Sequence, residues 1–319
     1  MIWTSLLSPR RAAARLGGRL AGILAQSART RGHYARAERL FRWALRAAER
    51  ALGPADIEVA AALNNLGVLY KDQGRYDEAE SVYQRARAIL VAREEESLEL
   101  ATLYHNLGGL EHARGRCARG EPLARRGLEI RERALGPEHP DVAADAAALA
   151  AILDGAGKRE EAEALFRRSL TTFERVYGSH HYEIAVTLNN LAALHQAKGD
   201  AEEAERLYRR ALTIKEQRLG ADHPDVAMTL NNLAVLYASH ARGAEAEPMY
   251  RRAVAIFETA LGPRHPKTIA CRENHGVLLQ ALQRPGAASS LELAQRPGVP
   301  ATTLKWATVQ RARSSGSGS

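Results

Sequence analysis

Pairs of asparagines recur along the sequence inside a repeated Leu-Asn-Asn-Leu motif. Three copies are complete and two weaker copies keep a single asparagine, so that the row comprises Asn64, Asn65, Asn106, Asn189, Asn190, Asn231, Asn232 and Asn274. An asparagine amide both donates and accepts hydrogen bonds, which lets such a row pair with the backbone of an extended peptide. The same amides can instead bond neighbouring helices and order their stacking. The residue types leave both interpretations open.

Other polar side chains share the face of the asparagines if these motifs lie on helices. Steps of three and four residues define one helix face, and in this sequence that face is mostly small and nearly neutral. Its further polar members are Lys71, His105 and Gln196. We therefore predict a peptide-binding surface made of the eight asparagines and these three side chains.

The histidines and cysteines favour structural roles over catalysis or metal binding. A histidine recurs once per repeat in one loop, at His139, His181, His223 and His265, which spreads possible ligands too far apart for one metal ion. The two cysteines, Cys117 and Cys271, are too few for a disulfide scaffold. The sequence also has no phosphate-binding loop, no nucleophile elbow and no Cys-x-x-Cys motif. We predict no cofactor, no metal and no enzymatic activity.

Pairs of arginines recur at the same 42-residue step and favour a solvated face. They are Arg125-Arg126, Arg167-Arg168, Arg209-Arg210 and Arg251-Arg252. A glutamate stands four residues before the first arginine of a pair, as Glu163 does before Arg167, which is the spacing of an intrahelical ion pair. Such pairing argues against a nucleic-acid surface on these helices.

The period itself is set by glycines that close recurring Ala-Leu-Gly, Val-Tyr-Gly and Arg-Leu-Gly segments. They stand at positions 53, 136, 178, 220 and 262, and the last four are each 42 residues apart. The asparagine motif keeps the same step. Two independent markers with one period indicate an array of internal repeats, each packing on its neighbours.

Each repeat predicts two helices. The first spans about residues 56–73 and carries Leu63, Leu66 and Tyr70 at helical spacing, and the second begins near Tyr76. A glycine after the second helix suits a left-handed C-terminal cap. The prolines that open the next repeat suit the first turn of a helix, where no amide donor is lost, and they are Pro140, Pro224 and Pro266.

This pattern resembles the tetratricopeptide repeat, in the 42-residue variety found in kinesin light chains and many bacterial proteins. The resemblance rests on segments such as 232–237, 204–212 and 219–226 and covers about residues 32–283. It implies an all-α, right-handed α-α superhelical solenoid whose first helices line a concave groove. It also suggests a basic groove for acidic peptides, from which this sequence departs, because Lys71 and two histidines are the only basic groups there. The heptad coiled coil of a kinesin light chain is absent.

We expect a repeat array at 32–283 between two atypical ends. Its units fall at about 32–53 (partial), 55–95, 96–136, 138–178, 180–220, 222–262 and 264–283 (partial). Residues 1–31 are expected to form a degenerate capping helix and residues 284–313 a degenerate cap, followed by a disordered Ser/Gly tail at 314–319. In unit 96–136, Gly120, Ala124 and Gly127 replace larger residues, which predicts the loosest packing of the array.

The net charge of +8 belongs to one end of the chain. Residues 1–53 hold eleven arginines and two glutamates, whereas the remaining 34 basic and 35 acidic side chains nearly cancel. A basic start rich in arginine and serine fits either a capping helix of a cytoplasmic protein or an organellar targeting segment. No apolar run is long enough to cross a bilayer.

The sequence therefore predicts a cytoplasmic, non-catalytic scaffold that binds a peptide or a partner protein in its groove. One alternative is a regulatory or self-associating repeat module that serves a separately encoded effector. Another is a protein that binds nucleic acid or another acidic surface through its basic N-terminal end. The oligomeric state and the identity of the partner stay open.

Overall fold

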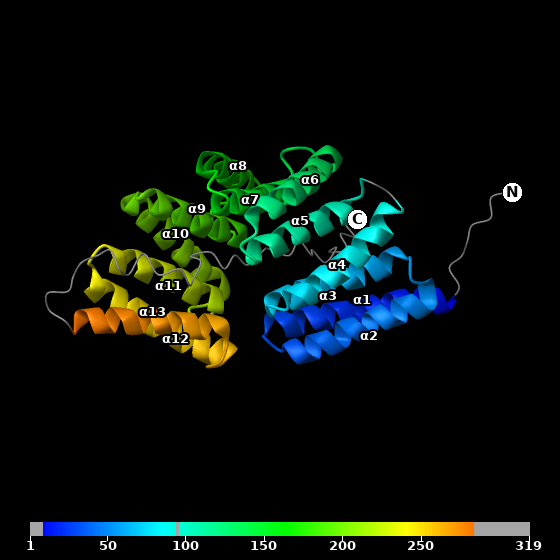
Figure 1. The fold of residues 1–319 in the computed structure, drawn as a ribbon, viewed down its shortest axis with the longest axis horizontal. Helices are drawn as coiled ribbons and strands as arrows, with labels where there is room; N and C mark the ends of the chain where they lie inside the picture. The colour runs from blue at the N-terminus through cyan, green and yellow to red at the C-terminus, as the bar shows by residue number, and fades with distance from the viewer. Residues whose placement is uncertain (1–8, 94–95, 284–319) are drawn as a thin grey trace, which may run out of the picture. The chain divides into compact units, whose positions relative to one another are not determined.

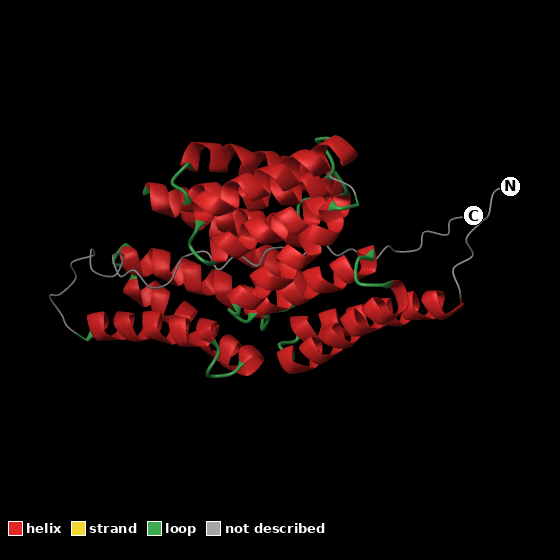
Figure 2. Ribbon diagram, turned by 45° about the vertical axis from the view of Figure 1, so that its right-hand side comes forward, coloured by secondary structure: helices red, strands yellow, loops and turns green. Residues whose placement is uncertain are grey.

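The computed structural model describes residues 9–93 and 96–283, which form α-helices joined by short loops and contain no strand (Figures 1 and 2). The described residues divide into two compact units, one up to Gly157 and one from Lys158 onward. The first unit comprises α1 (Pro9–Thr30), α2 (Tyr34–Leu52), α3 (Ile57–Asp72), α4 (Tyr76–Val91), α5 (Leu98–Ala113), α6 (Cys117–Leu135) and α7 (Pro140–Gly155). The second comprises α8 (Arg159–Tyr177), α9 (Tyr182–Lys198), α10 (Ala201–Leu219), α11 (Pro224–Ser239), α12 (Gly243–Leu261) and α13 (Pro266–Leu282). The all-α fold class is confirmed.

The first helices of the repeats begin as their sequence predicts. Pro140, Pro224 and Pro266 each occupy the first turn of a helix. The residue before each of them is a histidine whose side chain accepts a hydrogen bond from the backbone amide two residues further on. Asp56 and Ser97 provide the equivalent caps for α3 and α5. These caps satisfy amides that have no partner inside the helix.

The repeat glycines end the second helices in a conformation that differs from the prediction. Gly136 has φ 81° and ψ 155°, and Gly220 has φ 87° and ψ 156°. The positive φ excludes most side chains, but the ψ value lies far from the left-handed α region that we expected. The chain leaves the helix in an extended form, and the glycine amide still bonds to the carbonyl four residues earlier.

An aromatic ring stands at a fixed position of every second helix except α6, where Ala124 takes its place. These rings are buried, and they belong to Phe41, Tyr83, Phe166, Tyr208 and Tyr250. In the pair of α3 and α4, the ring of Tyr83 lies directly over Gly67, where a β-carbon would collide with it. Burying one such side chain contributes about 1.5–3 kcal/mol to folding.

The helices of unit 96–136 contradict the loose packing that we expected there. A β-carbon on Gly120 would lie 2.9 Å from the carbonyl oxygen of Gly108, and one on Gly127 would lie 3.0 Å from that of Ala101. Real β-carbons essentially never come as close as the first distance, and the second is tighter than nine in ten real β-carbon contacts. Because α6 has small residues at these positions, its backbone moves in against α5 and replaces ring packing with close backbone contact.

Contacts between repeats show which helices lie on the inner side of each unit. In the first unit α3 contacts both α1 and α5, and α5 contacts α7; in the second unit α11 contacts both α9 and α13. Among the described residues, second helices of one unit meet only through long side chains, and their backbones stay further apart than those of the first helices. The first helices are therefore the more closely spaced layer, and each unit curves with its first helices inside.

Three expected segments fall wholly or partly outside the described residues. Residues 9–30 of the basic N-terminal segment form α1, which packs on α2 through Ala21, Ala25 and Ala28. Residues 1–8, the expected C-terminal cap at 284–313 and the tail at 314–319 lie outside the part of the chain that the structure describes.

Candidate functional site

The eleven predicted binding residues all lie on first helices, the inner layer of each unit. The first unit carries Asn64, Asn65 and Lys71 on α3 and His105 and Asn106 on α5. The second carries Asn189, Asn190 and Gln196 on α9, Asn231 and Asn232 on α11, and Asn274 on α13. Each unit therefore carries one set of the predicted side chains on its first helices.

Hydrogen bonds join the asparagines of neighbouring first helices in a repeating pattern. The amide nitrogen of Asn106 donates to the side-chain oxygen of Asn64 at 2.8 Å. Asn232 donates to Asn189 at 3.4 Å, and Asn274 donates to Asn231 at 3.3 Å. In every case the second asparagine of one repeat bonds the first asparagine of the repeat before it. One of the two roles left open by the sequence, bonding between helices, is thus present in both units.

These bonds use only part of what the amides offer. Asn64 and Asn231 accept through oxygen, and within the described chain no bond occupies their nitrogen donors. Asn106 donates through nitrogen, and its oxygen has no described partner. Asn190 has no hydrogen-bond partner among the described residues although the residue is only 6% exposed. The inner layer therefore combines free donors with free acceptors, as one peptide group requires.

A buried charged cluster lies beside the asparagines of the first unit, and no sequence pattern predicted it. Nδ1 of His105 is 2.8 Å from Oδ1 of Asp145, and Nε of Arg131 is 2.6 Å from Oδ2 of the same carboxylate. Arg131 also donates to the hydroxyl of Thr102 at 3.0 Å. All three charged or titratable side chains are at most 7% exposed. The pair of Arg131 and Asp145 offsets the cost of burying either charge alone.

The second unit holds an equivalent cluster two repeats later, in which only one side chain is charged. Lys215 stands at the position of Arg131 and donates to the hydroxyl of Thr229 at 2.8 Å. Thr229 in turn donates to Asn189, which replaces His105. One repeat further on, the same three positions hold Asn231, Phe257 and Cys271. The substitutions show that the repeat accepts charged, polar or apolar residues at this inner position.

Lys71 and Gln196 occupy the same position in their repeats but differ in chemistry. Gln196 accepts a hydrogen bond from the hydroxyl of Tyr208 at 3.2 Å, which ties the inner helix to its partner. Burial lowers the pKa of Lys71 to about 8, with a smaller opposing effect from Asp72. An anionic group that binds beside Lys71 would favour its protonated form.

The recurring histidines cap helices, which is a structural role of the kind that the sequence favoured. Nδ1 of each histidine accepts a hydrogen bond from the backbone amide two residues later, at 3.1–3.3 Å. The acceptor–donor pairs are His139 and Asp141, His181 and Glu183, His223 and Asp225, and His265 and Lys267. The bond requires an unprotonated Nδ1, so it is made by the neutral ring. Within residues 9–93 and 96–283, no group of three or more side chains is arranged to hold a metal ion.

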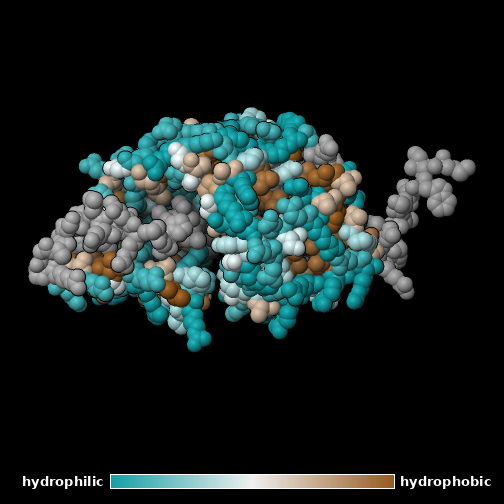
Figure 3. All heavy atoms as spheres, in the orientation of Figure 1, coloured by the Kyte–Doolittle hydropathy of each residue, from teal (hydrophilic) through white to brown (hydrophobic). Residues whose placement is uncertain are grey.

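The arginine pairs lie on second helices, and their predicted ion pairs are formed. Arg125, Arg167, Arg209 and Arg251 contact the glutamate four residues earlier, at 2.9, 2.8, 2.7 and 3.7 Å. Arg210 and Arg252 reach back to Glu174 and Glu216 of the preceding second helix. On the face seen in Figure 3, hydrophilic residues dominate and hydrophobic residues form small groups between them. The carboxylates of the second helices therefore neutralise the arginines that they contact.

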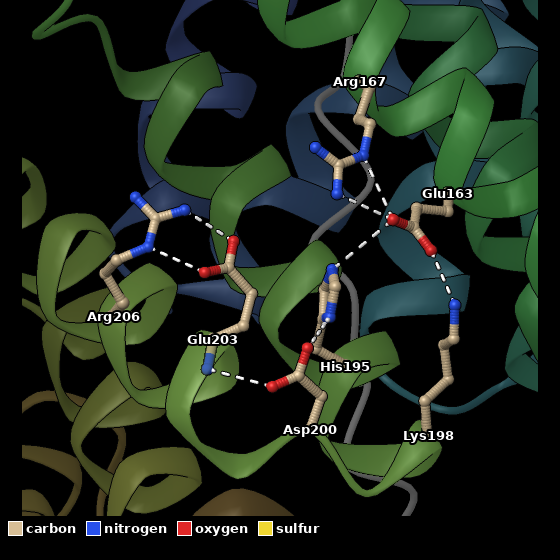
Figure 4. Close-up of polar contacts among 7 residues, drawn as sticks. All are labelled: Glu163, Arg167, His195, Lys198, Asp200, Glu203 and Arg206. Carbon is tan, nitrogen blue, oxygen red and sulfur yellow. Dashed lines mark hydrogen bonds and ion pairs between the residues drawn. The ribbon is translucent and has the colours of Figure 1, made fainter.

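A second polar cluster, shown in Figure 4, joins α8, α9 and α10 around Glu163. Glu163 accepts from Lys198 and from Arg167, both at 2.8 Å. These two bonds, that from Lys198 being the larger influence, lower the pKa of Glu163 to about 2. The largely buried ring of His195 lies between two carboxylates, 3.0 Å from Asp200 and 3.7 Å from Glu163.

The same arrangement recurs elsewhere with tyrosine in place of His195. The hydroxyl of Tyr237 donates to Glu205 and accepts from Arg209, while Arg242 lies over its ring at 4.0 Å from the centroid. Tyr70 repeats these contacts with Glu38, Arg42 and Arg75. The glutamates are spaced at the repeat period, which is the signal that the sequence offered. The cluster links each second helix to the next first helix and is structural.

The chain matches the sequence profile described as tetratricopeptide repeat over residues 18–90, 99–175, 144–217 and 183–259. None of the curated proteins matches it. Among the described helices, none combines the length and apolar character needed to cross a membrane.

Two solved structures share the fold of this chain, and one of them is of a putative kinesin light chain. BtubC (BKLC) from P. vanneervenii is 24% identical, with a TM-score of 0.53 over 82% of this chain and 94% of that one. A putative kinesin light chain from Podosopora anserina, with nearly identical repeats, is 22% identical, with a TM-score of 0.51 over 65% of this chain and 96% of that one.

Two Rap proteins share the fold as well. The Rap protein complexed with Competence and Sporulation Factor is 15% identical, with a TM-score of 0.59 over 84% of this chain and 77% of that one. The Rap conjugation gene regulator of plasmid pLS20, solved with the Phr* peptide, is 18% identical, with a TM-score of 0.60 over 73% of this chain and 61% of that one. At these identities the likeness concerns the fold. The profile matches, which cover most of the chain, show that it belongs to the tetratricopeptide repeat family.

Proposed function

We propose that this chain is a non-catalytic protein-interaction scaffold that binds an extended peptide, or an extended segment of a partner protein, against its first helices. The observation that carries the proposal is the partly used row of amides on the inner layer. Asn64 and Asn231 keep donors, Asn106 keeps an acceptor, and Asn190 makes no described bond. Backbone pairing of this kind places few demands on the peptide's side chains.

A solved structure of the same fold supports the proposal of peptide binding. A protein of the same fold, the Rap conjugation gene regulator, is solved with the Phr* peptide. Small residues on the first helices, such as Ala193, leave room for a chain to approach the helix backbone. In this proposal the binding surface belongs to the array at 32–283.

The cysteines support the non-catalytic part of the proposal. Burial raises the pKa of the Cys271 thiol to about 12 and also raises that of Cys117. Thiols with raised pKa values carry little of the thiolate that nucleophilic catalysis needs.

The proposal is tested by isolating a partner with the purified chain and measuring its affinity for variants. Asn190→Ala is the sharpest variant, because Asn190 has no described bond to lose when the peptide is absent. Removing an amide that bonds a desolvated peptide group costs about 1–3 kcal/mol, or roughly fivefold to 150-fold in affinity. Arg210→Ala is the control, since Arg210 pairs with Glu174 on the second helices. Loss of binding with Arg210→Ala and not with Asn190→Ala would contradict the proposal.

A further inference from the structure

Helix α1 carries a row of apolar side chains that nothing in the described fold covers. Leu16, Leu20, Ile23 and Leu24 are 62, 54, 62 and 55% exposed. They follow one another at steps of four, three and one residues and therefore share one face. The opposite side of the helix holds Ala21, Ala25 and Ala28, which are buried against α2. The fold uses the alanine face of α1 and leaves its leucine face free.

A tryptophan from α2 extends this apolar row. Trp43 is 49% exposed, and its ring lies 3.6 Å from the position that a β-carbon on Gly17 would take. Gly17 follows Leu16 directly, so the indole lies beside the leucine row. Of the eleven large hydrophobic side chains that are exposed in the described part of the chain, five lie within residues 16–43. We name these five residues, Leu16, Leu20, Ile23, Leu24 and Trp43, the α1 stripe.

The segment that carries the α1 stripe is rich in arginine. Residues 1–37 contain seven arginines and no acidic residue, and the first acidic residue is Glu38. Arg19, which is one turn from Ile23, is 69% exposed at its side chain while it contacts Glu58 at 3.1 Å. The sequence before the described part adds Ile2, Trp3, Leu6 and Leu7. Apolar side chains, tryptophan and arginine are thus concentrated at this end of the chain.

We propose that the α1 stripe docks on an anionic membrane surface, with α1 lying in the plane of the interface. Helices that lie on membranes combine a leucine- and tryptophan-bearing face with arginines, whose charge favours anionic lipids. Charge complementarity selects this occupant over a second copy of the chain, because pairing two α1 helices would bring two arginine-rich segments together. It also selects a membrane over nucleic acid, which has no use for an exposed leucine row. This site is separate from the proposed peptide surface and does not depend on it.

The test is co-sedimentation of the full chain with lipid vesicles. The full chain is mixed with vesicles of phosphatidylcholine alone and with vesicles that also contain phosphatidylglycerol. We expect binding to the anionic vesicles, weaker binding at about 1 M salt, where charges are screened beyond about 3 Å, and little binding to neutral vesicles. Leu20→Gln with Ile23→Gln should lower the partition coefficient at least about tenfold, because two apolar side chains leave the interface.

A matched variant separates the α1 stripe from general surface hydrophobicity. Val176 and Ile269 are 46 and 44% exposed and lie on α8 and α13. Val176→Gln with Ile269→Gln should leave vesicle binding unchanged, and circular dichroism checks that both double variants keep their helices. The proposal is overturned if no vesicle binds the chain, or if both double variants bind equally well. It is also overturned if Leu20→Gln with Ile23→Gln abolishes self-association in sedimentation while vesicles have no effect, which would assign the α1 stripe to a second copy.

Discussion

The buried carboxylate of Asp145 should be a main source of stability in the first unit. Asp145 is 2% exposed and accepts from Arg131, which is 4% exposed, at 2.6 Å. Asp145→Asn leaves the guanidinium buried without its counter-charge. Removing one partner of a buried ion pair costs about 3–5 kcal/mol, a large part of the roughly 5–15 kcal/mol by which a domain is stable.

A double variant distinguishes the loss of the pair from a loss of packing. Phe257 and Cys271 occupy the corresponding positions in a later repeat and are both buried. Arg131→Phe with Asp145→Cys should therefore recover much of what Asp145→Asn loses, since a buried ion pair can be replaced by apolar residues at little net cost.

Urea unfolding followed by circular dichroism and tryptophan fluorescence measures these differences. Glu129→Gln is the surface control, because the contact of Glu129 with Arg126 is long, at 3.4 Å, and both side chains are at least 40% exposed. Exposed pairs contribute about 0–1 kcal/mol. If Asp145→Asn costs no more than Glu129→Gln, the cluster is hydrated and the reasoning fails.

Three further predictions follow from single contacts. Gly67→Ala should destabilise the chain by about 1–3 kcal/mol, because the new β-carbon meets the ring of Tyr83. Gly276→Ala, whose new β-carbon has no heavy atom within 4 Å, should be neutral or slightly stabilising in the same urea unfolding experiments. Burial, with a smaller contribution from Arg218, lowers the pKa of His181 in the folded chain. The contribution of the neutral His181 ring to stability should therefore be complete above about pH 6.5 and should decline as the pH falls below that value. His181→Asn, which keeps a cap without a titrating ring, should remove that part of the pH dependence. Glu163, with a pKa of about 2, should stabilise the chain above about pH 4.3 and lose its contribution as the pH falls toward 2. The difference in stability between the parent chain and Glu163→Gln should therefore shrink in acid. A difference that stays constant with pH would refute the assigned ion pairs.

Features that repeat were predictable from the sequence. A 42-residue period is shared by the helix pairs, the proline starts, the histidine caps and the glutamate-arginine pairs. Because each feature recurs at the same step, the repeats together indicate the fold where a single copy would not. The position of the asparagines on the first helices followed from the same register. Their mutual bonds were one of two open possibilities, because an amide that can bond a peptide can equally bond a neighbouring asparagine.

Features that occur once were not predictable. Asp145 is a single acidic residue among alanines, and nothing in its neighbours indicates that Arg131 and His105 meet it. The packing of α5 on α6 was predicted wrongly, because small residues were interpreted as missing contacts when the backbones instead move closer. The exposure of the α1 stripe also depends on what packs beside α1, which a sequence pattern leaves undefined.

The central claim is that the uncommitted amides of the first helices bind a peptide backbone. Isothermal titration of a captured partner segment into the chain, Asn190→Ala and Arg210→Ala tests this most directly. We predict that Asn190→Ala weakens binding at least about fivefold with unchanged helicity, that Arg210→Ala binds like the parent, and that added salt has little effect, since the amides carry no charge. Binding that survives Asn190→Ala and disappears with Arg210→Ala or with salt would contradict the claim and move the site to the second helices.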